Sequence, residues 1–266
     1  MYRQKYSHDL AVALTVQAEK NMLEFEKNIT EQDKTILCEI LRDHRSLTSV
    51  QIAPDDEVKN PFWEEILTEL ASCNKVQSLL LRNVLLNTTN IRLLIQILDN
   101  NPSIKTLGLT LDRKVAPQLN SFHDQEMLSV LIEKLGQLKS LELLDLSNRN
   151  LSLHEEQLGT SLAQNSITHL TLRNCGLQDK FIQKISVLLN SATLKMIDFS
   201  NNKFTLPAVK DLIKPLHDVN LTLHRILNNE ELKDQELQKL LTEAKTQHHD
   251  TIFLEPRATK STGNRF

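Results

Sequence analysis

The side chains with the most chemical potential in this 266-residue chain are three cysteines and two adjacent histidines. Cys38, Cys73 and Cys175 are odd in number and far apart, which favours reduced, buried thiols over a disulfide framework. Cys175 lies in a repeated structural motif, so a buried thiol is a better interpretation than a nucleophile. His248 and His249 alone supply too few ligands for a typical metal site. We therefore predict no metal site and no cofactor.

Motifs that mark common catalytic sites are missing from the sequence. It has no G-x-x-x-x-G-K-[ST], G-x-G-x-x-G, H-E-x-x-H, C-x-x-C or G-x-S-x-G pattern. The formal net charge of -3 gives no global attraction to nucleic acid or to an anionic membrane. No apolar run approaches the roughly 18 residues of a membrane span. The sequence therefore predicts a binding protein, and an enzyme with an unrecognised site is the remote alternative.

One repeated pattern indicates which elements position the remaining polar side chains. Residues 141–151 (LELLDLSNRNL) and 167–177 (ITHLTLRNCGL) both have the spacing of L-x-x-L-x-L-x-x-[N/C]-x-L, with Arg149 at the [N/C] position of the first copy and Ile167 at the first position of the second. This is the leucine-rich-repeat template, in which each copy adds one short strand to a parallel sheet. The predicted copies begin at Leu47, Val76, Ile104, Leu141, Ile167, Leu194 and Leu221.

The length of the copies predicts the architecture. They are 26 to 29 residues long, except for the third, which is 37, so each has room for a return helix. Helices are about 10 Å wide and strands lie about 4.8 Å apart, so the stack must bend towards its strands. We predict an α/β solenoid, a leucine-rich-repeat horseshoe arc with about seven parallel strands on the concave face, helices on the convex face and helical caps at both ends.

The two ends of such an array need caps, because a terminal repeat would leave an apolar edge in water. Helical spacing predicts a first helix that begins at Ser7 and continues through Met22 and Phe25. Thr30 and Asp33 form a capping-box pattern that predicts the start of a second helix. The predicted domains are an N-terminal helical cap (1–46), the repeats (47–229), a C-terminal helical cap (230–249) and a flexible polar tail (250–266).

Alternation along the strands predicts which side chains face the open side of the sheet. The paired leucines of each copy are two residues apart and point into the core, so their neighbours point outward. Leu80, Leu143, Met196 and Leu223 would then be apolar groups among charged ones, a common mark of a contact surface. An ordinary solvated sheet face is the competing interpretation. The candidate partner-binding residues are Leu80, Arg82, Leu143, Asp145, His169, Thr171, Arg173, Met196, Asp198, Leu223 and Arg225.

The third copy contains the longest connection in the array, from Asp112 to about His123. Long loops on solenoids often serve binding. Arg113 and Lys114 on this loop are therefore a second candidate binding site, although a neutral insertion is an equally good interpretation.

Template and repeat length together resemble the ribonuclease-inhibitor class of leucine-rich repeats over residues 47–229. Cys175-Gly176-Leu177 matches its cysteine variant, and Asn202-Lys203-Phe204 matches its asparagine variant. The resemblance implies a module that binds folded proteins, often by covering an active site or a docking surface. The chain departs from the pattern at Val84, Asp112, Arg149 and His224.

The composition, with few glycines and many Asn, Lys and Gln residues, also resembles leucine-rich-repeat effectors that intracellular bacteria deliver by type IV secretion. We expect a non-enzymatic regulator or inhibitor of a folded protein partner, which would be a host protein, such as an enzyme, or another effector. A scaffold that bridges two proteins is the alternative. We expect a chain that is made in a cytosol, is monomeric on its own, binds no nucleic acid and, on the effector resemblance, is secreted into a host cytosol.

Overall fold

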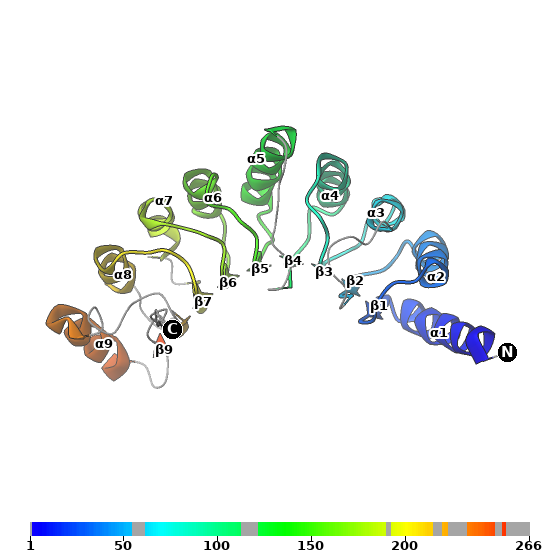
Figure 1. Ribbon diagram of the computed structural model, residues 1–266, viewed down its shortest axis with the longest axis horizontal. Coiled ribbons are helices and arrows are strands. Elements are labelled where there is room, and N and C mark those ends of the chain that lie inside the picture. The colour runs from blue at the N-terminus through cyan, green and yellow to red at the C-terminus, as the bar shows by residue number, and fades with distance from the viewer. Residues whose placement is uncertain are drawn as a thin grey trace, which may run out of the picture.

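The computed structural model describes residues 2–54, 62–112, 122–189, 193–214, 220–222, 233–247 and 252–253. In these residues helices and strands alternate, and they build one curved sheet with an outer layer of helices (Figure 1). The nine strands within the described ranges follow one another in chain order, and each is parallel to its neighbours. The α/β solenoid predicted from the repeat template is confirmed.

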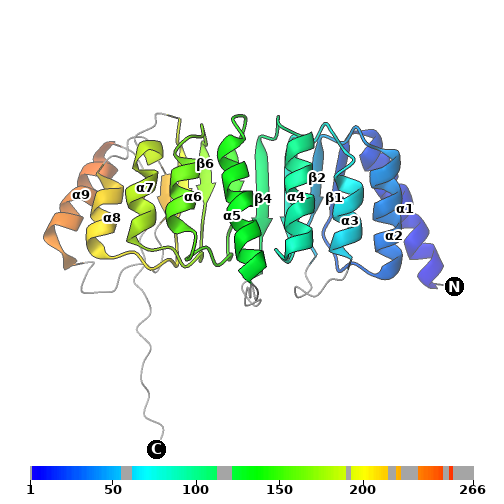
Figure 2. The ribbon, with the colours of Figure 1, turned by 90° about the horizontal axis from the view of Figure 1, so that it is seen from above.

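The bounds of the elements show the regularity of the array. The strands are β1 (Met22–Phe25), β2 (Ser49–Ile52), β3 (Ser78–Arg82), β4 (Thr106–Thr110), β5 (Leu143–Asp145), β6 (His169–Thr171), β7 (Met196–Asp198), β8 (Asn220–Thr222) and β9 (Ile252–Phe253). The helices are α1 (Tyr2–Glu19), α2 (Glu31–Asp43), α3 (Trp63–Leu70), α4 (Thr88–Asn100), α5 (Phe122–Gln137), α6 (Glu155–Leu162), α7 (Asp179–Leu189), α8 (Leu206–Ile213) and α9 (Gln235–Gln247). Figure 2 shows the helices standing next to one another along the convex side.

The core lies between the sheet and the helices. Leu144, Leu170 and Ile197 occupy matching positions on β5, β6 and β7, and each is 0% exposed. From the helix side, Ile185 and Val209 are also 0% exposed. Burying one such side chain stabilises the fold by about 1.5–3 kcal/mol. Because matching positions lie side by side from strand to strand, these side chains form one continuous core along the arc.

The first helix differs from its prediction at both ends. α1 begins at Tyr2 rather than Ser7, and it stops before Met22 and Phe25, which belong to β1. Asn21 separates the two elements and has a φ of 60°, in the left-handed region that terminates helices. A strand therefore precedes the first predicted repeat.

The edge of the sheet at β1 is covered by α1. Leu23 and Phe25 are buried on the core side, two residues apart as a strand requires. Leu14 and Ala18 bury the inner face of α1. The backbone N–H of Glu24 donates to the Gln17 side-chain oxygen at 2.8 Å, which satisfies one group of an otherwise unpaired strand edge.

The predicted start of the second helix is confirmed. Thr30 is the N-cap of α2, and its hydroxyl accepts from the backbone N–H of Asp33 at 3.2 Å. In return, the Asp33 carboxylate accepts from the backbone N–H of Thr30 at 3.0 Å. This reciprocal pair is the capping box that the two residue types predict.

The C-terminal end also departs from expectation. The tail was expected to be flexible from residue 250, but Ile252 and Phe253 pair with Leu221 and Thr222 and extend the sheet by one strand. α9 begins at Gln235, five residues after the predicted start of the cap. Residues 223–232 lie outside the described residues, as do 254–266.

Asparagine recurs at the bend that follows a strand. At each of these positions φ is near +60°, a conformation that asparagine adopts more easily than most residues. The four residues are Asn83, Asn148, Asn174 and Asn201, with φ of 64°, 65°, 55° and 60°. Each stands one residue before the Asn/Cys position of its copy, a signal that the sequence carries but that the template does not include.

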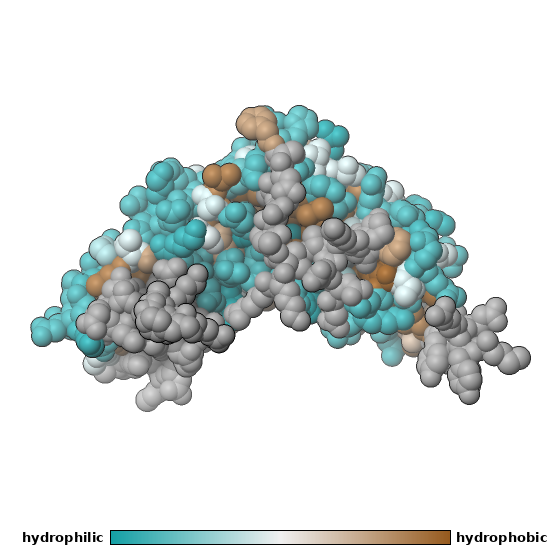
Figure 3. All heavy atoms as spheres, in the orientation of Figure 1, coloured by the Kyte–Doolittle hydropathy of each residue, from teal (hydrophilic) through white to brown (hydrophobic). Residues whose placement is uncertain are grey.

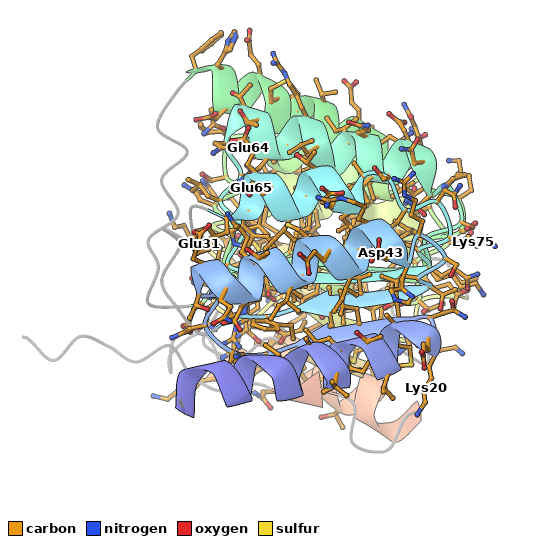
Figure 4. All side chains as sticks on the ribbon, turned by 90° about the vertical axis from the view of Figure 1, so that its right-hand side faces the viewer. Lys20, Glu31, Asp43, Glu64, Glu65 and Lys75 are labelled. Carbon is orange, nitrogen blue, oxygen red and sulfur yellow. The ribbon has the colours of Figure 1, made fainter. Side chains whose placement is uncertain are left out.

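Charge at the N-terminal end of the arc follows the helix dipoles. Glu31 lies in the first turn of α2, and Glu64 and Glu65 lie in the first turn of α3. Figure 4 shows these carboxylates at one edge of the solenoid and Lys20 and Lys75 at the opposite edge. Acidic groups stabilise helix starts, so this acidic edge has a structural explanation.

Hydrophobic side chains are scattered on the face of the arc seen in Figure 3, which is otherwise largely hydrophilic. The most exposed large apolar residues in the described part of the chain are Phe122 and Leu153, at 79% and 77%. No helix described here is both long and apolar enough to cross a membrane.

Candidate functional site

Three neighbouring strands bring together a three-by-three array of side chains on the concave face, which we name the concave patch. The register pairs matching positions of β5, β6 and β7. The array continues one position past each strand, where the N–H of Asn148 donates to Arg173 O and that of Asn174 to Ser200 O, both at 2.8 Å. Its members are Leu143, Asp145 and Ser147; His169, Thr171 and Arg173; Met196, Asp198 and Ser200.

The first row of the concave patch is apolar on either side of a histidine. Leu143 and Met196 flank His169, and Met196 is 38% exposed. The Nδ1 atom of His169 lies 2.8 Å from the hydroxyl of Thr168. An apolar side chain at such an exposure on a solvated sheet face leaves surface that a partner could bury.

The second row places a carboxylate on each side of Thr171. Asp145 Oδ1 accepts from the backbone N–H of Ser147 at 2.8 Å, and Asp198 Oδ1 accepts from that of Ser200 at 2.9 Å. Each carboxylate is thus fixed by a serine two residues further along the chain, just past the end of the strand. Within the described residues neither forms an ion pair. Burial raises the pKa of Asp145, Ser147 opposes this by hydrogen bonding, and the charge of Asp198 raises the pKa further.

Replacing Asp145 by asparagine is expected to raise the free energy of unfolding at pH 7. The amide keeps the oxygen that Ser147 requires but carries no charge to desolvate. Because the folded pKa is raised above its ordinary value of 3.8, wild-type stability is lost as the pH rises through the folded pKa. Urea unfolding at several pH values should show the advantage of the variant at neutral pH and its disappearance below 3.8.

The control for this measurement is Asp43→Asn, which changes an exposed carboxylate at the end of α2. Because Asp43 ends α2, removing its charge should change the stability by no more than the roughly 0.3–1 kcal/mol of an exposed charge at a helix end, less than Asp145→Asn does. A loss of stability in Asp145→Asn at pH 7 would contradict a cost of burying this charge.

The third row holds the only cation of the patch. The buried Nε of Arg173 has no hydrogen-bond partner in the described part of the chain. Arg173 also forms no ion pair with Asp145 or Asp198 there. The concave patch therefore presents two anions and one cation that do not neutralise one another by direct contact.

The other predicted partner-binding residues are placed differently. Leu80 and Arg82 lie on β3, two strands away from β5. A Cβ added to Gly108 would come 2.7 Å from Leu80 Cδ2, so Leu80 fills the space that this glycine leaves. Arg82 Nη2 lies 3.6 Å from Asp112 Oδ2. Both side chains thus have intramolecular contacts. Arg113, Lys114, Leu223 and Arg225 fall outside the described residues.

Asn202, at the Asn/Cys position of its repeat, stabilises the backbone that carries the concave patch. The side chain of Asn202 accepts from Cys175 N at 3.0 Å and Leu177 N at 3.1 Å, and donates to Leu172 O at 2.7 Å and Phe199 O at 2.9 Å. One buried amide thus pairs four backbone groups of two repeats. These bonds hold the turns after β6 and β7 in place.

Arg149 occupies the same position one repeat before Cys175, where the template expects Asn or Cys. Its guanidinium donates to Leu109 O at 2.7 Å, Thr110 O at 3.3 Å and Val84 O at 2.7 Å. The side chain is 4% exposed, and burial lowers its pKa to about 9, so it is charged at neutral pH. Arg149 therefore reaches two repeats back to the carbonyl of Val84. Val84 stands at the Asn/Cys position of its own repeat, and its side chain cannot form hydrogen bonds.

The three cysteines are expected to be unreactive in the folded chain. Cys175 is 0% exposed, as a thiol inside a repeat should be. Burial raises the pKa of Cys38 and of Cys73 to about 11, and raises that of Cys175 well above its ordinary range. The thiolate is the reactive form, so a thiol-specific chromogenic reagent should label none of them until urea is added. Rapid labelling of native protein would contradict this.

Other candidate sites have less structural support. In the described residues no group of three or more metal-ligating side chains comes together, and His248 and His249 fall outside these residues. A groove of about 400 Å³ between α7 and α8 includes Asp179 and Asp211 in its lining. Asp179 accepts from the backbone N–H of Thr205 at 2.8 Å, and Asp211 pairs with Lys214 at 3.2 Å. Its carboxylates are thus already in use.

Comparison with known proteins finds likeness among solved structures. The sequence matches no protein-family model and no curated protein. Among solved structures, the chain is similar to one described as the Rad7 and Elc1 complex in yeast, at 14% identity and a TM-score of 0.43. The similarity covers 90% of this chain and 73% of that chain. By its own repeats and the register of its sheet, the chain is a leucine-rich-repeat-like α/β solenoid.

Proposed function

We propose that this chain is a non-enzymatic protein-binding module whose concave patch holds a folded protein partner. The carrying observation is the patch itself, in which Leu143 and Met196 stand beside charges that have no ion-pair partner in the described part of the chain. Binding sites combine exposed apolar groups with charges that a partner can match. Such a rigid, curved sheet suits a convex protein surface better than a small molecule.

The regulatory role is also a proposal. By covering a functional surface of its partner, such as an active site, the module would act as a regulator or inhibitor. The compositional resemblance to type IV secretion effectors supports a host protein or another effector as the partner. It also supports delivery into a host cytosol.

Charge reversal at Arg173 and Asp198 tests the concave patch. We expect the R173E/D198R variant to lose at least about tenfold in affinity, because mismatched charges at a partly buried contact cost several kcal/mol. The measurement is recovery of partner proteins from bacterial and eukaryotic lysates by immobilised wild type and variant, followed by titration of the recovered partner.

A matched control exists on the convex side. Lys180 and Glu156 form an exposed ion pair at 3.0 Å, and the K180E/E156K swap makes the same types of charge change there. Circular dichroism should show both variants folded. Full affinity in R173E/D198R would reject the concave patch, and equal loss in the control would show that the effect is not local.

A scaffold is the second candidate function, and α1 supplies the observation that favours it. Val12 and Val16 are 50% and 46% exposed, one helical turn apart. A second protein bound at this end would make the module an adaptor. Simultaneous binding of two proteins, detected by size-exclusion chromatography with light scattering, would favour this function over simple inhibition.

A further inference from the structure

The histidine of the concave patch takes part in a hydrogen bond whose direction is decided by a second contact. Nδ1 of His169 lies 2.8 Å from the hydroxyl of Thr168. The same hydroxyl donates to Glu142 O at 3.0 Å. A hydroxyl group has one hydrogen, so the Thr168 oxygen accepts from the histidine. The hydrogen of the neutral imidazole is therefore on Nδ1.

The bond between Thr168 and Glu142 recurs in a repeat without a histidine at this place. Thr48 stands one residue before β2, as Thr168 stands one residue before β6, and its hydroxyl donates to Asn21 O at 3.1 Å. In both repeats the accepting carbonyl also bonds two consecutive backbone N–H groups. Ser49 rather than a histidine follows Thr48, so an adjacent imidazole is not needed for this bond.

The position of the hydrogen decides what the first row of the concave patch offers to a partner. With Nδ1 protonated, Nε2 at the tip of the His169 ring is a hydrogen-bond acceptor. Among the described residues none donates to Nε2. Leu143 and Met196 flank His169 on the two neighbouring strands, and Met196 is 38% exposed. The row thus presents one acceptor between two apolar side chains.

The spacing of the row fits one aromatic ring. Parallel strands lie about 4.8 Å apart, so Leu143 and Met196 are about 10 Å from each other at the backbone. A phenol carries its donor at the tip of an apolar ring, so its hydroxyl can reach Nε2 while both faces of the ring contact apolar groups. The sulfur of Met196 is also a favourable neighbour of an aromatic ring. An indole carries its donor on the side of the ring, which suits this end-on approach less well.

We propose that the protein partner inserts a tyrosine side chain between Leu143 and Met196, with its hydroxyl donating to Nε2 of His169. This inference rests on the proposed function and names the chemistry of one central contact. Tyrosine is enriched among the residues that dominate the energy of protein interfaces, because it combines a large apolar ring with a polar tip.

The first measurement is the tautomer of His169 in the full chain. Proton–nitrogen NMR at mildly alkaline pH, where the ring is neutral, distinguishes a protonated Nδ1 from a protonated Nε2 by their nitrogen shifts. We expect the hydrogen on Nδ1. Thr168→Val removes the hydroxyl and should allow both tautomers, whereas Thr48→Val removes the matching hydroxyl of the β2 repeat and should leave His169 unchanged. A wild-type ring protonated on Nε2 would overturn the proposal.

The second measurement is the binding of a defined probe. N-acetyl-tyrosine amide is titrated into protein with labelled methyl groups, and the methyl signals of Leu143 and Met196 are followed by NMR. N-acetyl-O-methyltyrosine amide is the matched probe, because it keeps the ring and lacks the donor. We expect saturable shifts with tyrosine and about three- to tenfold weaker binding of the O-methyl probe, the usual effect of one neutral hydrogen bond. Tighter binding of N-acetyl-tryptophan amide would overturn the choice of a phenol.

Protein variants connect the response to the histidine. His169→Phe keeps a ring but removes the acceptor, so it should bind the two tyrosine probes equally. Thr168→Val should lose part of the preference for the free hydroxyl, and Thr48→Val should keep all of it. Circular dichroism checks that each variant is folded. No response at about 10 mM probe, equal binding of both tyrosine probes to the wild type, or an unchanged preference in His169→Phe would overturn the proposal.

The outcomes separate this inference from the proposed function. A protein partner whose affinity falls in R173E/D198R but not in His169→Phe would uphold the concave patch and overturn the tyrosine contact. A tyrosine preference that depends on His169, with a protein partner insensitive to every patch variant, would uphold the tyrosine site and reject the patch as the protein-binding face.

Discussion

Replacing Arg149 by leucine should lower the free energy of unfolding by about 2–4 kcal/mol, because buried carbonyls lose their hydrogen-bond donor. The substitution keeps apolar bulk but removes the donor to the carbonyls of Val84, Leu109 and Thr110. Thr110 O still accepts from the backbone N–H of Asn83 at 2.9 Å, so Val84 and Leu109 lose the bond that Arg149 provides without this replacement. Each buried group left without a partner costs about 1–3 kcal/mol. Urea unfolding followed by circular dichroism measures the difference.

Two further variants serve as comparisons for Arg149→Leu. Lysine at position 149 keeps the charge but lacks the planar fork that reaches three acceptors, so Arg149→Lys should fall between wild type and leucine. Arg92→Leu changes an exposed arginine of α4 and should cost less than about 0.5 kcal/mol, as surface changes usually do. A neutral Arg149→Leu would mean that the carbonyls of Val84 and Leu109 find other partners.

Asn202→Leu is expected to cost about 2–4 kcal/mol, because a near-isosteric apolar side chain removes four hydrogen bonds and fills the same space. The loss should be local at first. The backbone amides of Cys175 and Leu177 are the donors to Asn202, so native-state hydrogen exchange should speed up at these two positions.

Asn28→Leu provides the comparison at an exposed position. It should leave both the unfolding free energy and the exchange of Cys175 and Leu177 unchanged. Unaltered exchange at these amides in Asn202→Leu would show that the turn after β6 is held by other contacts.

Much of the fold is predictable from the sequence because each copy repeats the same leucine spacing. Alternation then places Asp145, Thr171 and Asp198 in one row without any structural information, since parallel strands in equal repeats keep their register. Their position on the sheet follows from the template. Their role in binding stays a prediction.

Other features have no sufficiently local signal. In a segment as short as Met22–Phe25, periodicity does not distinguish a strand from the end of a helix. The segment forms a strand because it pairs with β2. The side chain of Leu80 packs over Gly108 on the neighbouring strand. The residue spacing within one repeat does not indicate this contact. Arg149 departs from the template by residue type, but its bonds span 65 residues to Val84.

The reach of Arg149 changes how the solenoid should come apart. In an array held only by contacts between adjacent units, stability is a sum of nearest-neighbour terms and fraying spreads one unit at a time. A single side chain that ties the β5 repeat to those of β3 and β4 adds coupling between non-adjacent units. The middle of the arc should then behave as one cooperative block, and the termini should open and close independently of it.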